Sequence, residues 1–299
     1  MSLWQDDNAR NRSMGIALLS LGTLSFSALD STVKWLLLAL PLGMVVWLRF
    51  VSHVFISMAL LTPRYGWQLF AVHNVRLQVA RAALLTVQTL INFWSIQFLQ
   101  LTETAAILFS SPLIVALISH LWLGERLRRL QWAAIVLGFV GVLMVVRPGA
   151  GVVHPAILLM VFNAVLFAGF TLLTRKMART ENAAAMQFYS ALGAALVLTP
   201  VGLAQWQTPA TALQWTAIVL TGLAGSMGHF LWARAHHFAP SVVLAPFGYQ
   251  QLLYMAVWGW LLFGDVPGTA VLLGATLIVA SGLFLLWEQG RGHTPPPTA

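Results

Sequence analysis

The chain has 299 residues, of which 59% are hydrophobic and only 8% are charged, and its mean hydropathy is +0.81. A soluble domain of this length would carry about a quarter charged residues, so the composition excludes an ordinary soluble protein and favours a surface in contact with lipid. The absence of cysteine excludes disulfides, thiolate metal sites and cysteine nucleophiles. The formal net charge of +8 comes from basic residues scattered at the ends of apolar segments, which indicates membrane topology and not a nucleic-acid-binding face.

Apolar segments of about 20 residues, the length needed to cross the hydrocarbon core of a bilayer, follow one another along the chain. They predict an all-α integral membrane protein with ten transmembrane helices and connections too short to hold an extramembrane domain. A polar N-terminal tail (1–13) precedes the first span, and a disordered tail (288–299) follows the last one. The predicted spans are 14–37, 41–62, 77–99, 103–123, 130–147, 155–175, 183–203, 212–234, 241–263 and 267–287.

Lysine and arginine are unevenly distributed between the predicted loops. If the N-terminus is cytoplasmic, nearly all basic loop residues fall on the inner side, and the outer loops hold little beyond Arg147. Loops rich in lysine and arginine stay in the cytoplasm. We therefore expect both termini to be cytoplasmic.

The two halves of the chain resemble each other. Residues 26–34 align with 167–175 at a separation of about 141, and Gly124-Glu125 aligns with Gly264-Asp265 at about 140. Because five is an odd number, a repeated five-helix unit enters the membrane upside down in its second copy. The sequence therefore predicts two inverted five-helix repeats, 14–147 and 148–287, an arrangement typical of secondary transporters.

Three short motifs stand in a fixed order in the first half: Ser110-Ser-Pro112, Gly124-Glu125 and Leu137-Gly-Phe-Val-Gly141. Their order and duplication resemble the EamA repeat of the drug/metabolite transporter superfamily, over about 14–287. In the second copy Leu252 stands about where the first has Pro112, and Asp265 replaces the glutamate. Within the superfamily the sequence is most similar to bacterial aromatic amino-acid exporters of the YddG type. The resemblance implies ten helices, a central cavity, a place in the bacterial inner (plasma) membrane and export of amino acids or related metabolites from the cytoplasm.

Polar and aromatic residues recur at helical spacing inside several predicted spans. Polar groups within a bilayer face either a water-filled cavity or another helix, so two interpretations are open: substrate binding and helix packing. Amides and aromatic rings together suit a zwitterionic amino acid, because they offer donors, acceptors, an apolar wall and cation–π contact. The candidate substrate-binding residues are Gln88, Asn92, Trp94, Phe109, Asn163, Phe167, Gln250, Tyr254 and Trp258.

Charged residues inside the first two spans are candidates for gating or for a charge pair. Asp30 and Lys34 are one helical turn apart, so they either neutralise each other or act on substrate or gate. Arg49 either grips a substrate carboxylate or extends its side chain toward the interface.

The predicted function is a transporter that exports aromatic and other apolar amino acids by alternating access through a central cavity. The alternative is an exporter of drugs or other small metabolites. Phosphate-binding and hydrolase motifs are absent from the sequence, so we expect neither an enzyme nor an ATP-driven pump, and no cofactor or metal. Facilitated diffusion is favoured, with proton coupling left open. The expected partners are a small-molecule substrate and the lipid bilayer, without nucleic acid or an obligatory protein partner.

Overall fold

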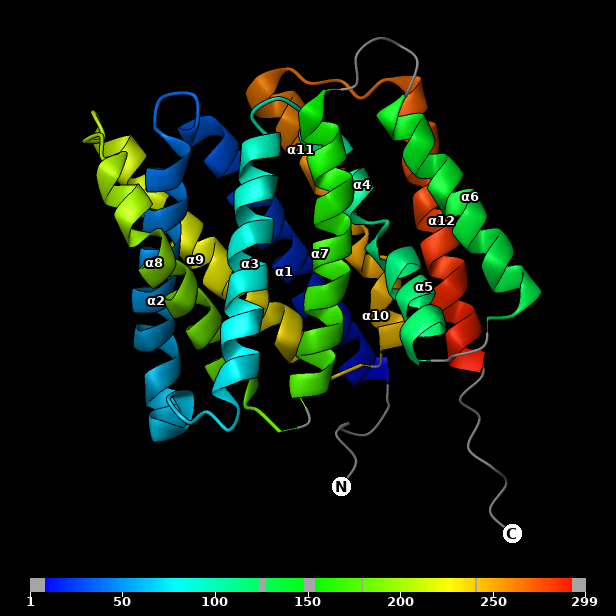
Figure 1. Cartoon of the computed structure of the whole chain (residues 1–299), viewed down its shortest axis with the longest axis horizontal. Coiled ribbons are helices and arrows are strands. Elements are labelled where there is room, and N and C mark those ends of the chain that lie inside the picture. Colours follow the sequence, from blue (N-terminus) through cyan, green and yellow to red (C-terminus); the bar gives the residue numbers. More distant parts are fainter. Residues whose placement is uncertain (1–8, 124–126, 148–153, 179, 240, 292–299) are drawn as a thin grey trace.

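The computed structural model describes residues 9–123, 127–147, 154–178, 180–239 and 241–291. These residues form twelve α-helices and one short 3₁₀ helix, and no strand is found among them (Figure 1). In the first half the helices are α1 (Ala9–Leu36), α2 (Leu42–Tyr65), η1 (Gly66–Leu69), α3 (Val75–Ser95), α4 (Leu101–Leu108), α5 (Ser111–Leu123) and α6 (Arg129–Val146). In the second half they are α7 (Pro155–Met177), α8 (Ala183–Ala204), α9 (Ala212–Ala235), α10 (Ser241–Gly248), α11 (Gln250–Phe263) and α12 (Thr269–Arg291).

Eight helical stretches of the described chain are long and apolar enough to cross a bilayer. They comprise α1, α2 with η1, α4 with most of α5, α6, α7, α8, α9 and most of α12. Large apolar side chains such as Leu196, Val197 and Leu253 are exposed on the outside of the bundle, as contact with lipid requires. The protein is thus a multi-pass membrane protein.

Two of the predicted spans lie outside these eight stretches. Span 77–99 corresponds to α3, whose buried polar side chains, such as Gln78 and Arg81, lower its hydropathy. Span 241–263 is divided between α10 and α11. The count of ten spans therefore stays a prediction.

The helices of the two halves run in opposite directions at corresponding places. Figure 1 shows α1 beginning at the lower side of the bundle, whereas α7, the first helix of the second half, begins at the upper side. The first residue of α1 and the last residue of α12 both lie at the lower side. These directions are the ones that an inverted second copy requires.

The most extensive packing joins helices from different halves. Helix α1 packs on α9 and α11, α2 on α8 and α9, α3 on α7 and α8, and α6 on α12. By the sequence offset of about 141, the α1–α9 pair corresponds to α7–α3, and the α2–α9 pair to α8–α3. The centre of the molecule is consequently an interface between the halves.

Both halves contain an interrupted helix at the same place in the repeat. The first interruption lies at Phe109 and Ser110, between α4 and α5, and the second lies at Tyr249, between α10 and α11. Pro112 stands in the first turn of α5, where its fixed φ favours a helix start. The second copy has no proline after its break, but Pro246 inside α10 cannot donate a helical hydrogen bond and weakens that helix instead.

The terminal helices extend further than the predicted tail boundaries. Helix α1 begins at Ala9, inside the predicted tail 1–13, and α12 continues to Arg291, inside the predicted tail 288–299, so the tail boundaries stay a prediction. One cause is visible at the C-terminal end, where Glu288 accepts a hydrogen bond of 2.7 Å from Arg128 and anchors the last turns of α12. The rest of both tails, and the predicted Gly124-Glu125 motif, lie outside the described residues.

Candidate functional site

The predicted substrate-binding residues come from α3, α7 and α11 and from the interruption between α4 and α5. Gln88 on α3 and Asn163 on α7 are almost fully buried, with 6% and 2% of their surface exposed. The Oδ1 atom of Asn163 has no hydrogen-bond partner among the protein groups. A buried amide without a partner is costly, which makes Asn163 more than an ordinary packing residue.

Some predicted residues contact one another, and others contact residues that were not predicted. Tyr254 donates to Gln250 Oε1 one turn earlier in α11, at 3.1 Å. Trp94 packs on Phe98 near the upper end of α3, with 4.8 Å between the ring centres. Phe167 stacks against Phe170 within α7, and Trp258 packs at the edge of the largest apolar cluster.

The two helix interruptions face each other. The rings of Phe109 and Tyr249 lie 5.2 Å apart, so the break of one half contacts the break of the other. Gly282 of α12 leaves room for this arrangement, because a Cβ there would collide with the Tyr249 hydroxyl. That hydroxyl is buried and has no hydrogen-bond partner among the protein groups. Tyr249 was missed by sequence reasoning, although its place at the equivalent of Phe109 was a usable signal.

The predicted pairing of Asp30 with Lys34 is wrong. Lys34 Nζ lies 3.0 Å from Asp265 Oδ2 and also donates to the Leu99 carbonyl at 3.0 Å. Asp30 instead accepts a hydrogen bond of 3.2 Å from Asn92 Nδ2. The physical reason is position along α1: Lys34, near the upper end, reaches the segment after α11, whereas Asp30 lies one turn deeper and faces α3.

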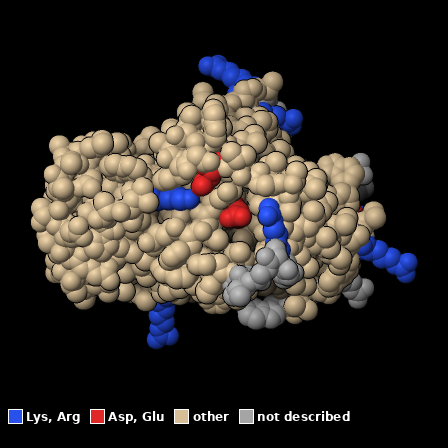
Figure 2. All heavy atoms as spheres, turned by 90° about the horizontal axis from the view of Figure 1, so that it is seen from above, with Lys and Arg blue, Asp and Glu red and all other residues tan. Residues whose placement is uncertain are grey.

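The Lys34–Asp265 pair joins the first half to the second at the upper face of the bundle. Figure 2 looks onto this face, where charged side chains are sparse and two small acidic areas lie near the middle beside basic ones. The side chains of Lys34 and Asp265 are 12% and 25% exposed.

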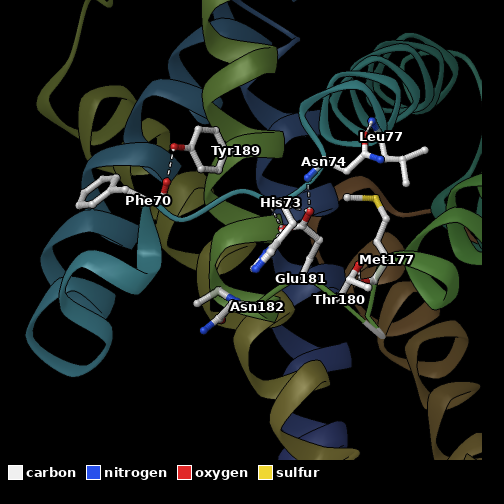
Figure 3. Close-up of polar contacts among 10 residues, drawn as sticks. Phe70, His73, Asn74, Leu77, Met177, Thr180, Glu181, Asn182 and Tyr189 are labelled. Carbon is white, nitrogen blue, oxygen red and sulfur yellow. Dashed lines mark hydrogen bonds and ion pairs between the residues drawn. The ribbon is translucent and has the colours of Figure 1, made fainter.

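A second cross-half contact lies at the lower face and was not predicted. Glu181, between α7 and α8, accepts hydrogen bonds from the backbone N–H groups of His73 and Asn74 at 3.1 and 2.7 Å (Figure 3). These groups stand at the start of α3, where the helix dipole favours a negative charge. A single acidic residue in a loop flanked by basic residues was the sequence signal for this contact.

Two arginines lie inside the bundle. Arg81 on α3 has three protein acceptors: its Nη1 donates to the Met186 carbonyl at 2.7 Å and to Ser190 Oγ at 2.5 Å, and its Nε donates to Thr174 Oγ1 at 3.0 Å. Arg49 on α2 is only 3% exposed, yet its Nε and Nη1 atoms have no acceptor among the described residues.

The predicted site thus divides into an upper cross-half contact at Lys34 and a buried centre. The buried centre is formed by Asp30, Asn92 and Arg49, with His53 and His229 below them, whose ring centres are 6.0 Å apart. Asp30 lies within electrostatic reach of Arg49, although no hydrogen bond joins the two side chains. Such a centre offers amide, carboxylate and guanidinium groups to a small polar molecule.

The sequence profile of the EamA-like transporter family matches the chain twice, over residues 13–147 and 154–287. The chain belongs to the EamA-like transporter family. The two matched ranges cover most of the sequence and are separated by residues 148–153.

Similar proteins in this family transport several kinds of small molecule. The chain is 27% identical to an S-adenosylmethionine uptake transporter of Rickettsia bellii, over 96% of this chain and 98% of the relative. It is 28% identical to a riboflavin transporter of Vibrio cholerae, over 91% of this chain and 88% of the relative. It is 25% identical to a pseudopaline exporter of Pseudomonas aeruginosa, over 91% and 95%. Aromatic amino-acid export, which the sequence resemblance implied, is not the activity named for any of these three relatives.

A solved crystal structure has the same fold as this EamA-family protein. The two superpose with a TM-score of 0.63 over 95% of this chain and 98% of the other, at 18% sequence identity. At that identity the likeness concerns the fold alone.

Proposed function

We propose that this EamA-family protein is a secondary transporter that carries a small organic metabolite across the bacterial inner membrane, through the interface between its two halves. The observation that carries the proposal is the polar centre at Asp30, Asn92 and Arg49, because polar groups buried within a bilayer mark substrate pathways. The facing helix interruptions at Phe109 and Tyr249 support it, since transporter sites are typically built from broken helices near the middle of the membrane.

The cargo is a small metabolite with both polar and apolar parts. The predicted substrate-binding residues Gln88, Asn92, Trp94, Phe109, Asn163, Phe167, Gln250, Tyr254 and Trp258 would supply amide groups and aromatic walls. Export of aromatic and apolar amino acids is one version of this proposal. The similarity to transporters of S-adenosylmethionine and riboflavin supports a broader range of candidates and leaves the direction of transport to experiment.

During alternating access, the contacts between the two halves at the upper face and at the lower face would break and form in turn. The Lys34–Asp265 pair closes the upper face in this conformation, and Glu181 holds the start of α3 at the lower face. We propose that the upper face is periplasmic and both termini are cytoplasmic, and that opening either side breaks the contact there.

Counterflow into proteoliposomes that contain only the purified protein tests this function. Vesicles would be loaded with unlabelled tryptophan, phenylalanine, S-adenosylmethionine or riboflavin, and uptake of the same labelled compound would be followed with and without a pH gradient. Saturable uptake of at least one compound, absent from protein-free vesicles, is expected. Insensitivity to the gradient would indicate a facilitator. No uptake of any compound by folded protein would overturn the proposed cargo class.

A further inference from the structure

The Arg49 side chain presents donors that no protein acceptor satisfies. Its guanidinium lies 4.2 Å from the ring centre of Phe50 and 5.9 Å from that of Phe93, so aromatic rings cover part of it. The buried Nε and Nη1 atoms have no hydrogen-bond partner, and a guanidinium has donors only. Asp30 does not take up these donors.

His53, one helical turn below Arg49 on α2, presents a further donor. Gln187 Nε2 donates to the Ser226 carbonyl at 3.1 Å and lies 3.4 Å from His53 Nε2. Gln187 Nε2 is an amide nitrogen, which donates hydrogen bonds and does not accept them, so the facing His53 Nε2 acts as the acceptor. The imidazole proton is therefore on Nδ1. This Nδ1 is buried and has no hydrogen-bond partner in the part of the chain that the structure describes.

The side chains of Arg49 and His53 both lie against one glycine of α9. A Cβ placed on Gly225 would lie 3.1 Å from Arg49 Nη2 and 3.3 Å from His53 Nδ1. Any side chain at position 225 would therefore crowd both groups. Buried donors on two neighbouring side chains, with no acceptor among the described residues, are the complement of a group that only accepts hydrogen bonds.

We propose that Arg49 and His53, beside Gly225, bind the carboxylate of the transported molecule. A carboxylate has two acceptor oxygens and no donor, and it pairs with a guanidinium through two parallel hydrogen bonds. Asp30, whose Oδ1 accepts a hydrogen bond from Asn92, lies within electrostatic reach of Arg49 and would face the positive part of a zwitterion. This inference rests on the proposed transport function, and it narrows the cargo to small carboxylic acids, amino acids included.

The test compares acids with their amides, because the amide keeps the shape and loses the charge. Binding to the purified protein would be measured by thermal unfolding with tryptophan against tryptophanamide, phenylalanine against phenylalaninamide, and indole-3-acetate against indole-3-acetamide. At least one acid is expected to bind wild type about 10- to 100-fold more tightly than its amide. In the Arg49→Gln variant this preference is expected to vanish, and Arg49→Lys should restore part of it.

The buried Arg81 provides the matched control. The Arg81→Gln variant removes a second internal guanidinium, and it is expected to keep the acid preference even where it unfolds at a lower temperature. If no acid binds wild type, if acid and amide bind equally, or if Arg49→Gln keeps the preference, the inference is wrong. If an acid binds selectively but no compound shows counterflow, the carboxylate site is supported and the transport proposal is wrong.

Discussion

Arg81 and Arg49 both come from the first half and lie in helix pairs that the repeat relates to each other, yet they behave differently. Arg81 projects from α3 at its packing against α8, and Arg49 projects from α2 at its packing against α9, two helix pairs that the repeat relates to each other. Arg81 donates to three acceptors, whereas the Nε and Nη1 atoms of Arg49 meet none. Both are buried, so burial does not separate a structural charge from a functional one. The two arginines differ instead in the hydrogen-bond acceptors that their guanidinium groups meet.

The largest expected effect is on stability, and it separates the two arginines. Arg81→Gln breaks several charged hydrogen bonds inside the protein and should lower the free energy of unfolding by about 2 kcal/mol. Arg49→Gln removes a guanidinium that is unpaired at Nε and Nη1, and should change that free energy by less than about 1 kcal/mol. Thermal unfolding in detergent, without added ligand, measures both. A loss for Arg49→Gln as large as that for Arg81→Gln would mean that Arg49 is structural and neutralises Asp30.

A methyl group on Gly225 should weaken acid binding without removing either donor. The added Cβ stands 3.1 Å from Arg49 Nη2, a contact that forces the flexible guanidinium aside. We expect Gly225→Ala to bind the preferred acid about tenfold more weakly, since about 1.4 kcal/mol corresponds to one charged hydrogen bond of modest strength. Gly169→Ala is the matched control, because nothing lies within 4 Å of a Cβ there. Equal acid affinities in the two variants would argue against a site at Gly225.

The smallest effect is expected at the upper cross-half contact. Lys34→Gln removes a partly exposed ion pair, which typically contributes about 0.2–1 kcal/mol, so the upper side should open about 1.4- to fivefold more often. The natural chain has no cysteine, so an Ile96→Cys background gives one buried reporter near this face. Its rate of reaction with a membrane-impermeant maleimide should rise in Lys34→Gln. An unchanged rate would show that the pair does not hold this face closed.

Much of the fold follows from the sequence because its signals are local. Apolar length located the helices, and the offset of about 141 residues located the equivalent helices of the second half. The break before Pro112 also has a local cause. The break at Tyr249 was harder to predict, since the second copy carries its proline at Pro246, before the break and inside α10.

The site depends on contacts between distant residues, which one sequence does not encode in a readable way. Lys34 and Asp265 are 231 residues apart, and the intrahelical spacing to Asp30 favoured the wrong partner. Likewise, spacing placed Arg49 inside the membrane, but only the packing of α2 against α9 reveals that its Nε and Nη1 atoms meet no acceptor. Local patterns identify buried polar groups, and the tertiary structure decides which of them are satisfied.

An experimental structure with a bound acid tests the central claim most directly. The acid would be whichever of tryptophan, phenylalanine or indole-3-acetate binds most tightly over its amide. The account predicts its carboxylate within hydrogen-bond distance of the Arg49 guanidinium and of His53 Nδ1, with Arg81 still bound to Met186 and Ser190. A carboxylate held at Arg81, at Lys34 or away from both buried arginines would contradict it.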